Sequence, residues 1–138
     1  SCKLGSIPRR RIRRFMMNRK PTIYVAGPMR GHHDYNYPAF DRQTRVLRAQ
    51  GWDVVNPADM DRTQFQPDSD PNDFNPDINY EDQEFMRDAL KRDMVAICDK
   101  CTAIYMMAGW ESSKGAKAEH ALAKALALEV FYEAPLPK

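Results

Sequence analysis

The chain has 138 residues, of which 43% are hydrophobic and 29% are charged, a composition typical of one folded domain rather than a disordered or fibrous chain. No apolar run approaches the roughly 20 residues of a membrane-spanning helix, and no apolar stretch follows the N-terminal charges as it does in a secretory signal. We therefore expect a cytoplasmic protein without membrane contact.

The net charge of +2 is unevenly distributed along the chain. Residues 1–20 contain eight of the 21 Lys and Arg residues and no acidic residue, so 13 basic residues stand against 19 acidic ones in the rest. A basic arm can bind nucleic acid, but the rest of the sequence has no basic stripe, and terminal charge runs are commonly solvated tails. We expect a solvated arm over residues 1–20 and one domain over 21–138. We expect no nucleic-acid binding by the domain; the arm is the one segment whose charge would suit such a partner.

Short apolar runs alternate with helical patterns after the arm. The strands are predicted at 22–26, 52–55, 103–107 and 129–132, and the helices at 36–51, 80–99 and 115–128. The segment 57–79 is rich in Asp and broken by three prolines after its first residue, so we expect no regular element there. This alternation predicts an α/β domain with a doubly wound parallel sheet of four to five strands, whose ligand site lies beyond the carboxyl ends of the strands.

The Cys and His residues indicate neither a metal site nor a redox site. Cys98 and Cys101 form a single C-x-x-C without a second pair of ligands, at a turn where a helix ends and a strand begins. His32 and His33 are adjacent, so their side chains diverge, and no acidic or Cys cluster accompanies them at ligand spacing. We expect no metal and no cofactor.

Two acidic residues lie at helix positions where apolar residues are expected. Asp93 shares a stripe with Leu90 and Ile97, and Glu119 shares one with Leu122 on the following helix. Because carboxylates are seldom buried without partners, either the assumed phase of the helix is wrong by one position or the two residues form a paired-carboxylate site. Their occurrence on two helices that pack against one sheet favours the paired site.

The segment 109–116 (GWESSKGA) has the composition of an anion site. It leads from a strand end into a helix start, where backbone N–H groups have no helical partners. Ser113 is either the N-cap of this helix or part of a phosphate site. Tyr24 places a phenol in an apolar strand, and a carboxylate on a neighbouring helix would satisfy its hydroxyl. Trp110 and Tyr35 are either packing residues or walls that stack on a base.

Three motifs occur in a defined order and spacing: TIYVAGPMRG at 22–31, KRD at 91–93, and SKGAKAE at 113–119. Together they resemble the nucleoside 2-deoxyribosyltransferase superfamily, especially its small phage and bacterial members. The resemblance covers about residues 22–132. It implies a flavodoxin-like sheet, cleavage of an N-glycosidic bond in a deoxynucleotide or nucleoside, and assembly into a homodimer or a larger oligomer.

The resemblance also implies catalytic roles. Glu119 matches the nucleophile that forms a covalent glycosyl-enzyme, Asp93 matches the acid that helps the base depart, and Tyr24 matches the tyrosine that positions the nucleophile. Two carboxyl groups suit this chemistry, because one stabilises an oxocarbenium-like transition state while the other handles the proton.

Position 113 distinguishes two branches of the superfamily. The transferases that act on free nucleosides usually have an Asp six residues before the nucleophile, whereas Ser113 looks like the branch that hydrolyses 2′-deoxynucleoside 5′-monophosphates. A carboxylate there would repel a phosphate, and a hydroxyl would bind it. The implied residues for binding substrate and phosphate are Gly27, Met29, Arg30, Gly31, Trp110, Ser113, Gly115 and Ala116. Deoxyribosyl transfer between free nucleosides and bases, and a non-catalytic nucleotide-binding module, are the alternatives.

Overall fold

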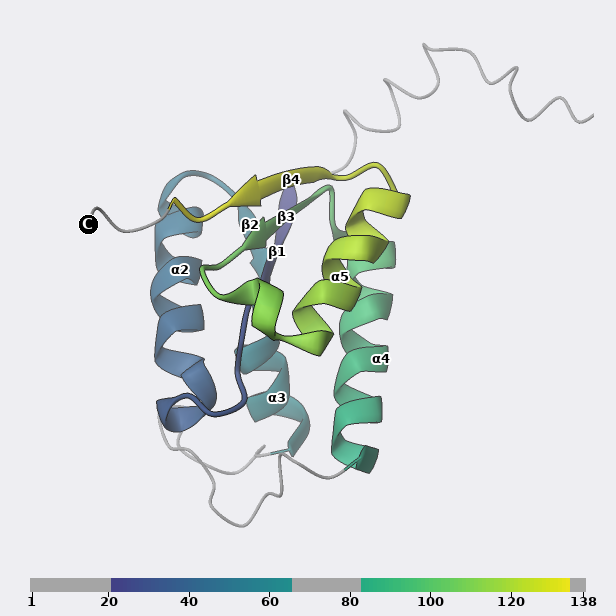
Figure 1. Cartoon of the computed structure of the whole chain (residues 1–138). Helices are drawn as coiled ribbons and strands as arrows, with labels where there is room; N and C mark the ends of the chain where they lie inside the picture. The colour runs from purple at the N-terminus through teal and green to yellow at the C-terminus, as the bar shows by residue number, and fades with distance from the viewer. Residues whose placement is uncertain (1–20, 66–82, 135–138) are drawn as a thin grey trace, which may run out of the picture.

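Four parallel strands form one sheet in the computed structural model, which describes residues 21–65 and 83–134 (Figure 1). They are β1 (Thr22–Ala26), β2 (Asp53–Val55), β3 (Ala103–Met106) and β4 (Glu129–Tyr132), in the order β2-β1-β3-β4. In the central strand, Ile23 pairs with Val54 of β2 and with Ala103 of β3. This sheet confirms the predicted α/β class. The basic arm at 1–20 lies outside the described residues.

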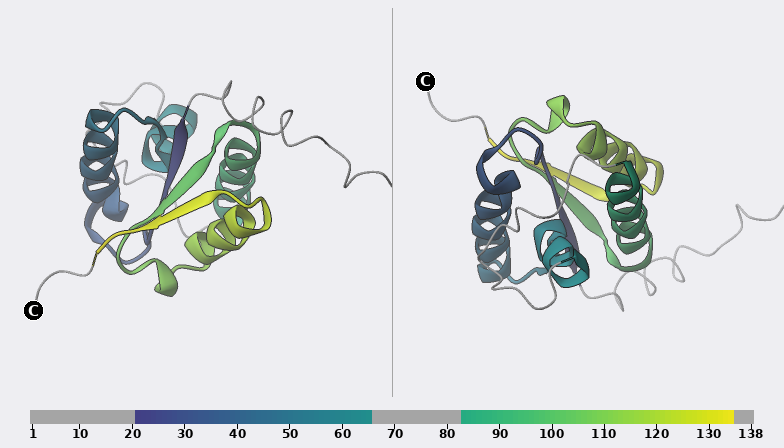
Figure 2. Two further views of the ribbon diagram at one scale, coloured as in Figure 1. Left: turned by 90° about the horizontal axis from the view of Figure 1, so that it is seen from above. Right: turned by 90° about the horizontal axis from the view of Figure 1, so that it is seen from below.

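Helices cover both faces of the sheet (Figure 2). On one face lies α2 (Tyr37–Ala49); on the other lie α4 (Gln83–Lys100) and α5 (Lys114–Ala125), and α3 (Pro57–Phe65) lies between α2 and α4. Two 3-10 helices, η2 (His33–Asn36) and η3 (Trp110–Ser112), lie in the connections after β1 and β3. Within 21–65 and 83–134, no helix has both the length and the apolar character needed to cross a membrane.

The side chains of β1 alternate between the two faces, as the period of a strand requires. Ile23 and Val25 pack in a cluster with Phe40 of α2, and Tyr24 packs in a second cluster with Ile97 of α4. The four β1 residues from Ile23 to Ala26 are completely buried, which explains the continuous apolar run in the sequence. The alternation therefore directs the Tyr24 side chain toward α4 and α5.

The helix α3 corrects the prediction that no regular element follows β2. The side-chain oxygen of Asn56 accepts a hydrogen bond from the amide of Ala58 at 3.0 Å, and Pro57 begins the helix. An N-cap Asn followed by Pro is itself a start signal for a helix, but the acidic composition of the segment obscured it. The rest of that segment, residues 66–79, lies outside the described residues.

The other helix boundaries differ from the predictions by a few residues. The helix expected over 115–128 begins at Lys114 and ends at Ala125. Ala127 has a φ of 57°, the left-handed conformation that commonly ends helices, and the chain then enters β4. The helix expected over 80–99 is described as Gln83–Lys100, and residues 80–82 lie outside the described ranges.

Candidate active site

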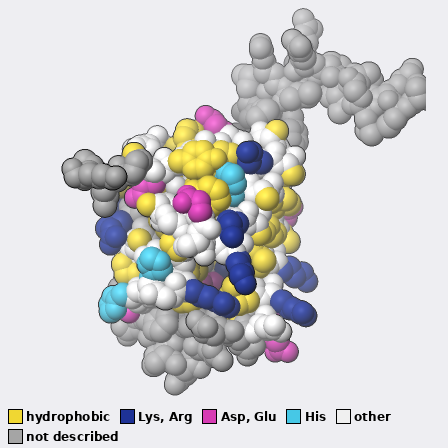
Figure 3. Space-filling model, in the orientation of Figure 1, with side chains coloured by type: hydrophobic (Ala, Val, Ile, Leu, Met, Phe, Trp, Pro, Cys, Tyr) yellow, Lys and Arg dark blue, Asp and Glu magenta, His cyan; other side chains and the backbone are white. Residues whose placement is uncertain are grey.

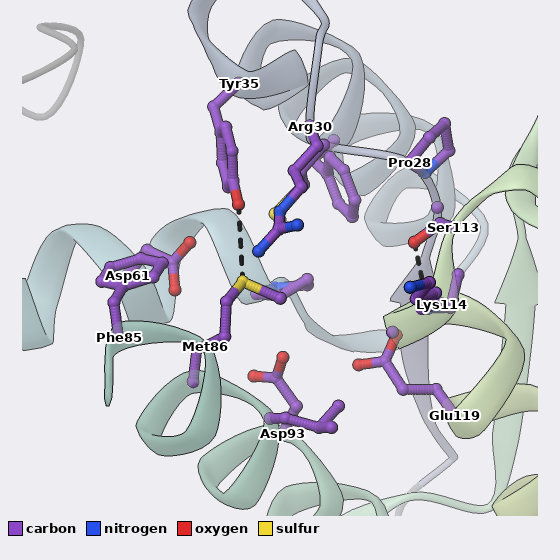
Figure 4. A pocket seen from close by; sticks show the side chains of 18 of the residues that line it. Pro28, Arg30, Tyr35, Asp61, Phe85, Met86, Asp93, Ser113, Lys114 and Glu119 are labelled. Atoms are coloured by element: carbon purple, nitrogen blue, oxygen red, sulfur yellow. Dashed lines mark hydrogen bonds between the residues drawn. The ribbon is translucent and has the colours of Figure 1, made fainter. Parts of the chain in front are cut away.

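A cavity of about 500 Å³ opens beyond the carboxyl ends of β1 and β3 (Figure 4). The chain runs from β1 to β2 on one side and then crosses to β3 on the other, so the cavity lies at the topological switch point where α/β sheets bind ligands. Its lining comes from the segment after β1, from α3 and α4, and from the start of α5. The volume lies within the range of small-molecule sites.

Tyr24, Asp93 and Glu119 meet at this cavity. The Tyr24 hydroxyl donates a hydrogen bond to Oε2 of Glu119, and the Asp93 and Glu119 carboxyl groups lie near each other on α4 and α5 (Figure 4). Tyr24 is fully buried, Glu119 is 5% exposed and Asp93 is 8% exposed. Both acidic residues are therefore buried and paired, and the alternative of a wrong helical phase is excluded.

Burial raises the pKa of all three groups. The pKa of Asp93 is raised to about 6, chiefly by desolvation, while Arg92 acts in the opposite direction. The pKa of Glu119 lies well above its ordinary value because of burial and then of the Asp93 charge, although the Tyr24 hydrogen bond lowers it. The pKa of Tyr24 is raised by burial and by both carboxyl groups. Two interacting carboxyls of this kind titrate as a pair, so one can be charged while the other keeps its proton.

Arg92 connects Asp93 to a third buried carboxyl group. Its Nη2 atom lies 2.7 Å from Oδ1 of Asp93 and 2.7 Å from Oδ1 of Asp61, and its Nε lies 3.1 Å from the same Asp93 oxygen. Asp61 also accepts a hydrogen bond from the Tyr37 hydroxyl at 2.8 Å, and it lines the cavity. Burial raises the pKa of Asp61, although Arg92 and Tyr37 oppose the rise.

The N-terminal end of α5 forms another wall of the cavity. Ser113 is the N-cap, because its Oγ accepts a hydrogen bond from the amide of Ala116 at 3.2 Å. The hydroxyl hydrogen of Ser113 is still able to bind a ligand oxygen. The amides of Lys114 and Gly115 belong to the first helical turn, whose N–H groups lack helical partners and, with the helix dipole, favour an anion.

Basic side chains lie around this end of α5. Arg30 lines the cavity and points into it (Figure 4), and Lys114 lines it as well. Lys and Arg side chains gather on the surface around the start of the helix (Figure 3). The cavity therefore combines buried carboxyl groups on one side with positive charge at its rim, an arrangement that suits a ligand with an anionic end and an electrophilic carbon.

The glycines predicted to bind substrate have different surroundings. Gly27 lines the cavity together with Met29, but a Cβ atom on Gly27 would lie 2.6 Å from Cε and 3.0 Å from Cβ of Met107. Glycine at position 27 therefore permits the close approach of two strand ends. Gly31 does not line the cavity; it is exposed, and its φ of 78° shows that it provides a left-handed turn.

Trp110 also lies outside the cavity lining. Its ring centroid is 4.3 Å from that of His120 and 6.2 Å from that of Tyr132, and His120 Nε2 is 2.8 Å from the Tyr132 hydroxyl. Tyr35 does line the cavity, and its hydroxyl lies 3.8 Å from Sδ of Met86 (Figure 4). The structure thus places Tyr35 in the cavity lining and packs Trp110 on His120 outside it.

Residues 21–132 match a family described as "Domain of unknown function (DUF4406)". The chain belongs to this family. The matched range contains every described residue of the cavity lining, so this part of the site lies within the DUF4406 domain. No curated protein matches the chain. The family description names no activity, and the resemblance to deoxyribosyltransferases stays a prediction.

Three residues at the DUF4406 site were missed by the sequence analysis: Asp61, Arg92 and Lys114. Asp61 lies on α3, so the start signal at Asn56 and Pro57 would have placed it in the second turn of a helix. Lys114 begins α5, directly after the expected N-cap. Arg92 belongs to the KRD motif, but its pairing with Asp93 left no signal, because consecutive side chains of a helix normally diverge and nothing in the sequence shows that this one folds back.

Proposed function

We propose that this protein hydrolyses the N-glycosidic bond of 2′-deoxynucleoside 5′-monophosphates through a covalent glycosyl-enzyme on Glu119. The observation that carries the proposal is the buried pair of Glu119 and Asp93, with Tyr24 bonded to the former, at a cavity of ligand size. The resemblance of the three sequence motifs supports the same reaction. Hydrolysis and deoxyribosyl transfer differ only in the molecule that attacks the covalent intermediate.

In the first step, the Glu119 carboxylate attacks C1′ of the deoxyribosyl group, and the electrons of the C1′–N bond leave with the base. Asp93 gives its proton to the departing base. The Tyr24 hydroxyl holds Oε2 of Glu119 and leaves the other carboxylate oxygen for the attack. Positive charge develops on the sugar close to two carboxyl groups in a buried setting, where such charges interact strongly.

In the second step, water attacks C1′ of the glycosyl ester, and the ionised Asp93 takes a proton from that water. The bond between C1′ and Glu119 breaks, its electrons return to the carboxylate, and 2-deoxyribose 5-phosphate is released. Two displacements retain the configuration at C1′. A pKa of about 6 suits Asp93 for this double role, because the group must both give and accept a proton near neutral pH.

The 5′-phosphate is assigned to the start of α5. The Ser113 hydroxyl, the amides of Lys114 and Gly115, and the side chains of Arg30 and Lys114 offer it hydrogen bonds and positive charge. A free 5′-hydroxyl would gain little from these donors. This difference favours monophosphates over nucleosides as substrates.

Release of free base from the four 2′-deoxynucleoside 5′-monophosphates tests the proposal. The products are separated by chromatography, with and without a second free base in the reaction, and the matching nucleosides are assayed in parallel. We expect free base and 2-deoxyribose 5-phosphate from the monophosphates, and no new nucleotide when the second base is present. Formation of a new nucleoside would support transfer, and binding without release of base would support the non-catalytic module.

A further inference from the structure

Asp61 has no step in the reaction proposed above, yet it is one of the most buried charged groups described, with 2% of its surface exposed. Both of its oxygens are engaged. Oδ1 accepts from Nη2 of Arg92 at 2.7 Å, and Oδ2 accepts from the Tyr37 hydroxyl at 2.8 Å. These two donors hold the carboxylate in one orientation, so its charge has a fixed position relative to Arg92.

Arg92 is shared between α3 and the acid Asp93. Its Nη2 is 2.7 Å from oxygens of both Asp61 and Asp93, and its Nη1 donates to Oε1 of Gln64 at 3.0 Å. The two acceptors on α3, Asp61 and Gln64, therefore compete with Asp93 for the hydrogen-bond donors of one guanidinium. Arg92 itself does not line the cavity, so it acts on a substrate only through its neighbours.

We propose that Asp61 is a positioning residue, which divides the guanidinium of Arg92 between two carboxyl groups and thereby keeps a proton available on Asp93 for the departing base. The part of this inference that concerns base departure rests on the proposed function. The part that concerns the proton on Asp93 is a property of the free protein.

The balance of charges around Asp93 gives the direction of the effect. The groups that act on it come from four elements: Tyr24 of β1, Asp61 of α3, Arg92 of α4 and Glu119 of α5. Burial is the largest effect and raises the pKa of Asp93; Arg92 opposes it, and the charge of Asp61 raises the pKa further. Without the Asp61 charge, Arg92 would act on Asp93 alone, and the carboxylate form of Asp93 would become more stable.

Two substitutions should consequently shift the titration midpoint of Asp93 in opposite directions. Asp61→Asn removes the competing charge, so the titration midpoint of Asp93 should fall by about one pH unit. Arg92→Lys loses the planar fork that reaches two carboxylates, so the midpoint should rise. The matched controls are Asp59→Asn and Lys91→Gln, which change an exposed residue on each of the same two helices and should leave the midpoint in place.

The test is a carboxyl-carbon NMR titration of Asp93 in the substrate-free full chain, followed by the pH profile of base release. Opposite shifts of the Asp93 midpoint in the two variants support the inference, whether or not base is released. Absence of base release would reject the proposed function alone. An unmoved midpoint in a folded Asp61→Asn or Arg92→Lys variant would overturn the inference, and if only one of them folds, its midpoint decides. In an active enzyme, the alkaline limb of kcat/KM should move with the midpoint. A uniform loss of rate without movement of the limb would show a merely structural role and reject the inference.

Discussion

Replacing Asp93 by Asn should remove a loss of stability that the wild-type protein undergoes as the pH rises. The side chain is 8% exposed, and burial raises its pKa from 3.8 to about 6. A carboxyl group whose pKa is higher in the folded state than in the unfolded state favours folding when it is protonated. This contribution is complete below pH 3.8 and disappears as the pH passes through about 6.

The size of the effect follows from the shift. A rise in pKa from 3.8 to about 6 corresponds to about 3 kcal/mol. The wild-type protein should therefore lose about 3 kcal/mol more than the Asp93→Asn variant between pH 4 and pH 7, which is a large fraction of the ~5–15 kcal/mol that stabilises a typical domain. Removal of the Asp93 charge also lowers the pKa of Glu119, which widens the difference in the same direction.

Urea unfolding at a fixed protein concentration, followed by tryptophan fluorescence from pH 4 to pH 8, measures this difference. Asp88→Asn is the matched control, because Asp88 is exposed on the same helix and its replacement should leave the profile of the wild type. Parallel profiles for wild type and Asp93→Asn would refute the reasoning, since they would mean that Asp93 is as readily ionised in the folded protein as in the unfolded chain.

Three other predictions concern substrate choice, packing and assembly. In steady-state assays of both substrates, wild-type kcat/KM should favour monophosphates over nucleosides by at least ~1.5–3 kcal/mol. Ser113→Asp should reverse this preference. A wild-type preference for nucleosides would reject the phosphate site. Gly27→Ala should cost about 1–3 kcal/mol in urea unfolding, because the added Cβ would lie 3.0 Å from Cβ of Met107, an atom that no rotation of the Met107 side chain can move away. Gly115→Ala meets no atom within 4 Å and should keep the stability of the wild type, and equal stabilities of the two variants would contradict the packing argument. Light scattering at micromolar concentration should show at least a homodimer, and a monomer would contradict this expectation.

Much of the fold could be predicted because local patterns agree with the tertiary arrangement. The apolar run at 22–26 is a fully covered central strand, and the carboxylates at positions 93 and 119 lie on helix faces that pack toward it. Tyr24 needed a hydrogen-bond partner, and Glu119 is that partner, 95 residues further along the chain. A polar group in an apolar stripe predicts that a partner exists, and the fold class limits where the partner lies.

The remaining features depend on contacts that a linear pattern does not contain. The three prolines and the acidic residues of 57–79 obscured α3, although Asn56 and Pro57 begin it in an ordinary way. The pairing of Arg92 with Asp61 joins two helices across 31 positions, so no local pattern in the sequence contains it. Trp110 belongs to the segment that leads into the anion site, but its ring packs on His120, a direction that its position in the sequence does not determine.

The rate of base release by Glu119→Gln tests the assignment of the nucleophile most directly. Gln keeps an acceptor for the Tyr24 hydroxyl and nearly the same volume, so the variant should fold as the wild type does. Glu129→Gln provides the matched control, because Glu129 is exposed at the start of β4. We predict that Glu119→Gln loses at least about 10³-fold in kcat for 2′-deoxynucleoside 5′-monophosphates while Glu129→Gln keeps the wild-type rate. The Tm of Glu119→Gln at neutral pH should be no lower than that of the wild type, because burial raises the pKa of the carboxyl group that it replaces. Base release by Glu119→Gln within tenfold of the wild-type rate would contradict a covalent mechanism at this residue.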